Sequence, residues 1–201
     1  MQNKDTNTVA SKEISKMNLD ELRNDIARKQ KMGLPFMCAS IVIWALIMVV
    51  TMLGLPQDKE NTLVFCCSCP LMPLAWIIGK ALKVNIFDKS NPLNNAGLIL
   101  TCTQLLYLLI VMWVFNAVPD KMVMVYAMVF GSHLFPFSWL YKSVSYQVYS
   151  ILMPIAFLCV GCMFSATVVA ATALTIESLL VISLFIEANK LIHMKGENYG
   201  K

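Results

Sequence analysis

Residues 96–118 read AGLILTCTQLLYLLIVMWVFNAV, a stretch that contains no charged side chain. An α-helix rises about 1.5 Å per residue, so a run of this length covers the roughly 30 Å hydrocarbon core of a bilayer. Inside lipid every backbone amide needs an internal partner, and a helix provides one for each. The stretch therefore predicts a membrane-spanning helix.

Five other segments are also long and predominantly apolar. The chain has 201 residues, of which 58% are hydrophobic and 14% charged, whereas soluble domains carry about 25% charged residues. We expect an all-α polytopic membrane bundle of six transmembrane helices. The expected spans are residues 33–55, 62–80, 96–118, 122–141, 146–164 and 168–189. Only three residues separate the last two spans, so a single bent or re-entrant segment is the alternative there.

Basic residues are distributed unevenly between the two sides that these spans define. Fourteen Lys and Arg residues fall on the side of the termini, whereas only Lys59 and Lys121 fall on the other side. Cytoplasmic loops of membrane proteins carry an excess of Lys and Arg. The distribution predicts that both termini are cytoplasmic. It also accounts for the net charge of +4, so this charge does not indicate a nucleic-acid-binding surface.

The remaining segments are polar. Asn18 and Glu21 have the spacing of a capping box, which predicts a short amphipathic helix at the cytoplasmic surface. An extension of the first span into the cytoplasm is the alternative. We divide the chain into a disordered polar tail, this amphipathic helix, the transmembrane domain and a cytoplasmic tail, at residues 1–16, 17–32, 33–190 and 191–201.

A weak internal repeat relates the first four spans. When the sequence is shifted by 63 residues, LMPLAW (71–76) falls on LFPFSW (134–139), and Pro56 falls on Pro119. The matched Pro-x-x-Trp pattern predicts a tandem repeat of two helical hairpins, spans one and two followed by spans three and four.

The segment from residue 17 to residue 141 resembles a known group of proteins. The stretches that carry the resemblance are CSCPLMPLAW, QLLYLLIVMWVF, VPDKMVMVYAMVFG and PFSWLYKS. They resemble a family of small bacterial multi-pass membrane proteins that is known only as a domain of unknown function. The resemblance implies a bacterial cell membrane and implies no activity or catalytic residue.

One carboxylate lies inside an expected span. Glu177 falls near the middle of the sixth span, and Ala166, Ala170 and Ala173 share its helical face. Small residues on one face favour close helix packing. A charge at the membrane centre costs about 2.5–3.5 kcal/mol. We therefore expect Glu177 to face the interior of the bundle.

His133 in the fourth span and Gln104 in the third lie at a similar depth. A contact between Glu177 and His133 would let the two groups share a proton, with Gln104 as a further hydrogen-bonding group. The functional interpretation is a proton relay or a polar substrate site. The structural interpretation is an interhelical hydrogen bond that fixes packing.

Prolines interrupt two of the expected spans. Pro70 and Pro73 fall in the second span, and Pro136 falls in the fourth, where its ring would free the backbone carbonyl of Ser132. Freed carbonyls at matching positions of two repeats can line a transport site. A pair of structural kinks is the alternative.

The cysteines form a second candidate site. Cys66, Cys67 and Cys69 lie near the outer end of the second span, and Cys159 and Cys162 lie near the outer end of the fifth. A membrane thiol oxidoreductase would need such thiols near an oxidising surface. Free cysteines also pack as small hydrophobic side chains. Their irregular spacing predicts no metal site.

Three functions are compatible with these features. The first is a transporter or permease for a small molecule or an ion, with a mid-membrane polar site around Glu177. The second is a membrane thiol oxidoreductase, and the third is a non-catalytic partner subunit. Motifs of phosphate-binding loops and metalloproteases are absent from the sequence. We therefore expect no cofactor and no nucleic-acid partner. The lipid bilayer is the expected partner, and an oligomer is compatible with the pattern.

Overall fold

The structure, a computed structural model, describes residues 17–198. The predicted tail at residues 1–16 lies outside the described residues, as do residues 199–201. All regular elements within residues 17–198 are helices. They are α2 (Leu19–Lys29), η1 (Lys31–Gly33), α3 (Leu34–Thr51), α4 (Gln57–Cys67), α5 (Leu71–Ala81), α6 (Pro92–Ala117), η2 (Pro119–Lys121), α7 (Met122–His133), α8 (Phe135–Tyr141), α9 (Val144–Met163) and α10 (Ala166–Asn198).

Six helical segments of the described chain are long and apolar enough to cross a membrane, which confirms the predicted all-α bundle of six spans. The last two segments are separate helices, α9 and α10, so the alternative of one bent segment is wrong. The six segments are Lys31–Thr51, Gln57–Ala81, Pro92–Ala117, Pro119–Tyr141, Val144–Met163 and Ala166–Leu191.

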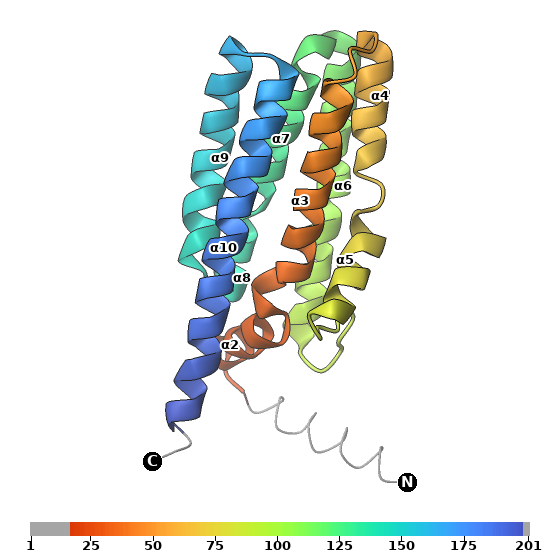
Figure 1. Cartoon of the computed structure of the whole chain (residues 1–201). Helices are drawn as coiled ribbons and strands as arrows, with labels where there is room; N and C mark the ends of the chain where they lie inside the picture. Colours follow the sequence, from red (N-terminus) through yellow and green to blue (C-terminus); the bar gives the residue numbers. More distant parts are fainter. Residues whose placement is uncertain (1–16, 199–201) are drawn as a thin grey trace.

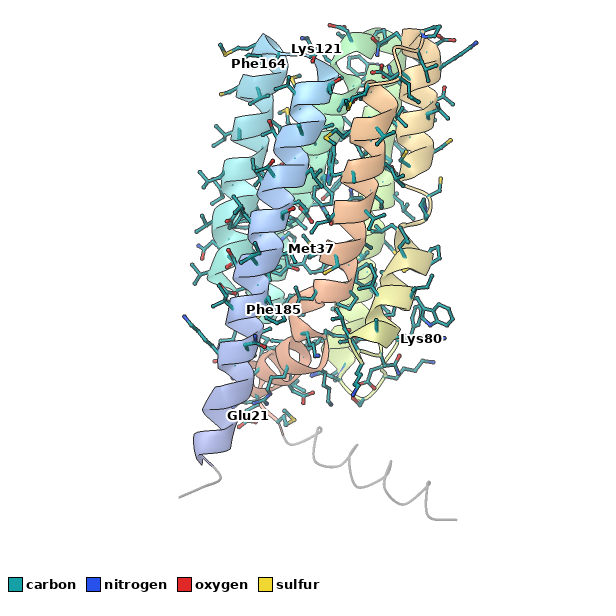
Figure 2. All side chains as sticks on the ribbon, in the orientation of Figure 1. Glu21, Met37, Lys80, Lys121, Phe164 and Phe185 are labelled. Carbon is teal, nitrogen blue, oxygen red and sulfur yellow. The ribbon has the colours of Figure 1, made fainter. Side chains whose placement is uncertain are left out.

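The spans stand side by side in a single bundle (Figure 1). Helices α3, α7, α9 and α10 pack closely and form its core. Helices α4 and α5 cover α3, and α6 lies against α7 and α8 with few contacts to α4 or α5. The α2 end of the bundle carries Glu21 and Lys80, and the opposite end, which we call the Lys121 end, carries Lys121 (Figure 2).

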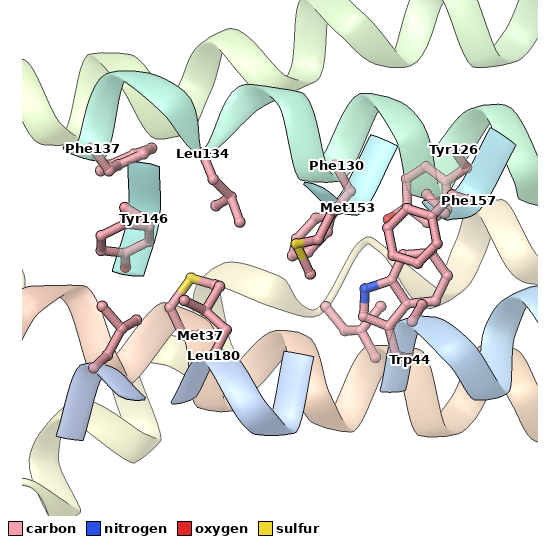
Figure 3. Packing of buried hydrophobic residues seen from close by; sticks show 14 of the residues in the cluster. Met37, Trp44, Tyr126, Phe130, Leu134, Phe137, Tyr146, Met153, Phe157 and Leu180 are labelled. Carbon is pink, nitrogen blue, oxygen red and sulfur yellow. The ribbon is translucent and has the colours of Figure 1, made fainter. Parts of the chain in front are cut away.

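Aromatic side chains fill the core between α3, α7 and α9. The Trp44 ring is almost fully buried, and its centroid lies 5.4 Å from that of Tyr126, 5.7 Å from Phe130 and 6.4 Å from Phe157. Aromatic pairs at such separations attract one another beyond the gain from burial. Figure 3 shows Trp44, Tyr126 and Phe157 gathered toward one end of the core, with Met37 and Leu180 farther along it. The cluster therefore joins α3, α7 and α9 at this level of the bundle.

Prolines break the second and fourth spans. The second consists of α4 and α5, with Ser68, Cys69 and Pro70 between them, and the fourth consists of α7 and α8, which meet at Leu134. Proline lacks an amide proton, and its ring clashes with the preceding turn. At the first break the Cys69 amide donates to the Cys66 carbonyl instead, at 3.1 Å. The second span is therefore interrupted near its middle and the fourth span nearer its C-terminal end, whereas the repeat itself stays a prediction.

Helix α2 is a separate element packed across one end of the bundle. Its capping box forms as the spacing predicts: the Glu21 amide donates to Asn18 Oδ1 at 2.9 Å, and the Asn18 amide donates to Glu21 Oε2 at 2.8 Å. Arg23 Nε donates to the Trp139 carbonyl at 2.7 Å, and the guanidinium lies 4.8 Å from the centroid of that ring. The alternative, in which this helix simply extends the first span, is wrong.

A left-handed turn separates α2 from α3. Lys31, Met32 and Gly33 have φ angles of 46°, 58° and 74°. Such a conformation costs roughly 1–2 kcal/mol for each residue other than glycine. Tyr146 Oη stabilises the turn by donating to the Met32 carbonyl at 2.8 Å, and Lys31 Nζ donates to the Leu82 carbonyl at 2.9 Å. The turn lets α2 fold back beneath the bundle.

Candidate functional site

Glu177 lies on α10 and is completely buried against α3. Ala173 and Ala170, one and two turns before it, are also buried and let the two helices approach closely. The partner of Glu177 is Ser40 on α3, whose Oγ forms a very short hydrogen bond with Glu177 Oε1. The buried carboxyl therefore joins α10 to α3.

The hydrogen-bonding capacity of this carboxyl is only half used. Glu177 Oε2 is buried and has no hydrogen-bond partner among the described residues. The Ser40 hydroxyl also lies 2.8 Å from the Met37 carbonyl, and its one proton cannot serve both oxygens. The ion pairs between described residues all lie outside this region, so no cation compensates a charge on Glu177. An uncompensated buried charge is costly. When the carboxyl carries its own proton, it can donate to Ser40 while Ser40 donates to the Met37 carbonyl, so both contacts of Ser40 are satisfied.

Ser40 also faces a cavity of about 50 Å³, which we call the α2-side cavity. Its wall combines aromatic rings with polar side chains from α3, α6 and α7. A second cavity of about 60 Å³, the middle cavity, lies farther toward Trp44. The two cavities share Ser40, Leu71, Thr101, Gln104 and Phe130 in their walls. Spaces of this size and polarity can hold water molecules.

Gln104 and His133 present unused polar atoms at these cavities. Gln104 is 7% exposed, lies in the wall of both cavities and forms no side-chain hydrogen bond with the described residues. His133 Nδ1 lies 2.5 Å from the Phe130 carbonyl, which can only accept, so Nδ1 carries the proton. The lone pair of Nε2 then remains as an acceptor beside the α2-side cavity.

The expected direct contact between Glu177 and His133 does not form. Glu177 bonds to Ser40, and His133 bonds within its own helix. Ser40 was missed, although it is the one hydroxyl in a long apolar run and needs a hydrogen-bond partner. The relation between Glu177 and the cavities therefore runs through α3 and not through α7.

Ser132 does not belong to this group. Its side chain is exposed on the outside of α7, where Oγ donates to the Met128 carbonyl at 2.9 Å. Its side chain does not contribute to the polar site, because the residue before His133 on a helix points about 100° away from it. The role of its backbone carbonyl stays a prediction.

The cysteines of the described chain are all free. Cys66, Cys69, Cys159 and Cys162 are exposed on the bundle surface, and Cys67 is partly buried. Helices α4 and α9, which carry the two outer groups, stand on opposite sides of the bundle (Figure 1). The structure therefore does not bring the five predicted redox thiols into one site. The described residues also contain no cluster of three side chains that could hold a metal ion.

The fold and the site define a multi-pass helical membrane protein with a small polar interior. Residues 19–187 match a family described as a family of unknown function, DUF7010, and the chain belongs to this family. No curated protein and no solved structure matches the chain.

Proposed function

We propose that the chain is a proton-linked membrane transporter with its proton-binding group at Glu177. The observation that carries the proposal is the buried Glu177 carboxyl, which bonds only to Ser40 while Ser40 lies in the wall of two small cavities that also contain Gln104. Ionisable groups inside a membrane protein are costly and commonly mark ion or proton pathways. A purely structural carboxyl would be expected to have both oxygens satisfied.

The side chains at the two ends of the cavities support this proposal. At the α2 end the wall includes Gln30, whose Nε2 donates to the Asn85 carbonyl at 2.9 Å. At the other end the buried Trp44 and Tyr126 rings line the space. A transporter must hold its site away from both aqueous phases in at least one state, and we propose that these side chains serve that purpose.

The proton of Glu177 can be observed directly. In liposomes containing the purified chain, infrared spectroscopy should detect a protonated carboxylic acid band that disappears in Glu177→Gln. Transfer to D₂O should shift this band, because a proton pathway must exchange with water. Glu60→Gln, at the Lys121 end, is the matched control and should leave the band in place.

A transport assay completes the test. A panel of small polar compounds and amphiphiles would be added outside liposomes with a trapped pH-sensitive dye and an imposed proton gradient. At least one compound should cause proton movement across the membrane in liposomes with the wild-type chain. The same compound should cause no proton movement in liposomes with Glu177→Gln. A Glu177 band that never exchanges in D₂O would show a sealed structural carboxyl and would refute the proposal.

A further inference from the structure

A lateral groove runs between the second and third spans. It has a volume of about 500 Å³ and lies where α6 makes few contacts with α4 and α5. Most of its wall is apolar, with Phe65, Met72, Leu105, Leu109 and Met112 as the larger side chains. Leu105 and Leu109 are more than 60% exposed, so lipid is the medium that the groove meets. Ligand pockets of globular proteins have volumes of roughly 300–1,000 Å³.

The break in the second span places a polar group at the inner wall of this groove. Ser68 follows the last residue of α4, and its Oγ lies 2.7 Å from Tyr126 Oη on α7. The two hydroxyls carry two protons, and one of them is used in the bond between the pair. The second proton has no acceptor among the described residues. A free O–H donor therefore lies where the groove meets the core.

The groove adjoins the interior of the protein at this point. Ser68, Thr101 and Leu108 belong to the wall of the groove and also to the wall of the middle cavity. Gln104 also lines this cavity, is 7% exposed and forms no side-chain hydrogen bond within the described chain. A buried polar group without a partner costs free energy that a bound ligand can restore. The apolar wall of the groove, which faces lipid, thus adjoins the middle cavity, where hydrogen-bonding groups have no partner in the described chain.

We infer that the groove and the middle cavity together bind an amphiphile with one hydrocarbon chain and an uncharged hydrogen-bonding head group. The walls of both spaces contain no Asp, Glu, Lys, Arg or His, so a charged head group would find no counterion. The hydrocarbon chain occupies the groove, and the head group reaches Gln104 and the hydroxyl pair of Ser68 and Tyr126. The inference rests on the proposed function, in which this amphiphile is the substrate and enters from the bilayer.

Photolabelling tests the position of the hydrocarbon chain. The purified chain in lipid nanodiscs would be irradiated with a diazirine-bearing decanol, and the labelled peptides would be identified by mass spectrometry. Labelling should concentrate on α4, α5 and α6 and should fall when unlabelled decanol competes. Leu108→Trp fills the junction and should reduce this labelling at least fivefold, whereas Ile182→Trp, on the exposed face of α10, should not. Equal labelling of all exposed helices would overturn the inference.

The head group is tested by comparing the decanol with a diazirine-bearing decane. Competition should show that the decanol binds about three- to tenfold more tightly, as expected for one or two satisfied hydrogen bonds. Gln104→Leu and Tyr126→Phe should each reduce this preference while the decane still labels the groove. Labelling by the decane also shows that each variant is folded. A preference that survives in both variants would contradict the assignment of the head-group site.

These measurements separate the binding site from transport. If the groove is labelled but the Glu177 proton never exchanges with water, the amphiphile-binding site is supported and the proposed transport function is refuted. If the Glu177 proton exchanges with water but labelling of the groove does not saturate, the proposed transport function stands and the amphiphile is refuted as its substrate.

Discussion

Ser40 has one hydroxyl proton and two oxygen atoms within reach, the Met37 carbonyl and the carboxyl of Glu177. At the scale of single residues, this competition couples the protonation of Glu177 to the packing of α3. When Glu177 keeps its proton, both oxygens next to Ser40 can be satisfied. When the proton leaves, a buried charge retains only one hydrogen bond, which is costly in apolar surroundings.

We predict that Ser40→Ala lowers the free energy of unfolding by about 1–3 kcal/mol, because Glu177 then loses its hydrogen-bond partner. In a Glu177→Leu background the same substitution should cost much less, since no carboxyl remains to be satisfied. Thermal unfolding in detergent, followed by circular dichroism, measures all four chains. Ser178→Ala is the matched control, because that hydroxyl bonds only to the Leu174 carbonyl of its own helix. Equal costs in both backgrounds would mean that Ser40 and Glu177 are not coupled.

The burial of Glu177 could be predicted at this scale, but its partner could not. The face shared by Ala170, Ala173 and Glu177 follows from helical spacing alone. The choice between Ser40 and His133 depends on how each helix is rotated against its neighbours, and hydrophobicity specifies that rotation poorly when most faces are apolar. Depth along the membrane was therefore an insufficient criterion for contact.

At the scale of elements, α7 and α9 approach closely at Gly131. A Cβ atom added there would lie 2.7 Å from Met153 Cβ and 3.2 Å from Pro154 Cδ. Neither atom belongs to the flexible end of a side chain. We predict that Gly131→Ala pushes the helices apart and costs about 1–3 kcal/mol in thermal unfolding.

Gly97→Ala is the matched control for this substitution, because its added Cβ would meet only Leu140 Cδ2, at 3.2 Å. That methyl group can rotate away, so the control should be nearly silent. A Gly131→Ala chain as stable as the control would show that α7 and α9 are packed less tightly than described.

The connection between α5 and α6 is joined to α2 through Ser90, whose hydroxyl accepts from Lys29 Nζ at 2.9 Å and donates to the Asp88 carboxylate at 2.6 Å. Burial raises the pKa of Asp88, but hydrogen bonds from the Ser90 hydroxyl and amide, together with the charge of Lys29, outweigh it and hold the pKa below its ordinary value. A lowered pKa in the folded state stabilises the fold above the unfolded-state pKa of about 3.9. This stabilisation is lost as the pH falls through the lower folded value.

We therefore predict that wild type is more stable than Asp88→Asn at neutral pH. The difference should shrink as the pH falls below about 4. Thermal unfolding of wild type and Asp88→Asn at each pH measures this difference in stability. Effects of acid on the other titratable groups are the same in both chains and cancel in the comparison. A difference that grows on acidification would mean that the pKa of Asp88 is raised and not lowered.

Element boundaries divide into those with a sequence signal and those without one. Prolines marked the breaks in the second and fourth spans, and the Asn18–Glu21 spacing marked the start of α2. The left-handed turn at Lys31 and Met32 had no such signal, since neither residue type favours positive φ. Tyr146, which is far away in sequence, holds this turn. Such a contact is not visible in local sequence.

At the scale of the whole molecule, apolar run length was sufficient to predict six spans, because the bilayer sets one length for all of them. Which span packs loosely could not be predicted in this way. The third span, α6, is among the most hydrophobic, yet it lies at the edge and leaves the groove beside α4 and α5. In lipid, hydrophobicity does not drive helices together, so it carries no information on which helices lie inside.

The orientation of the bundle in the membrane remains a prediction of the charge distribution. Lys59 and Lys121 belong to the end of the bundle away from α2, whereas Lys80 and Lys142 belong to the α2 end. The excess of basic residues predicts that the α2 end is cytoplasmic. In bacterial cells, Lys59→Cys should react with a membrane-impermeant maleimide from outside, above the labelling of the unmodified chain. Lys142→Cys should react only after the membrane is permeabilised. The reverse pattern would invert the topology and would place α2, together with Gln30 in the wall of the α2-side cavity, on the outer face.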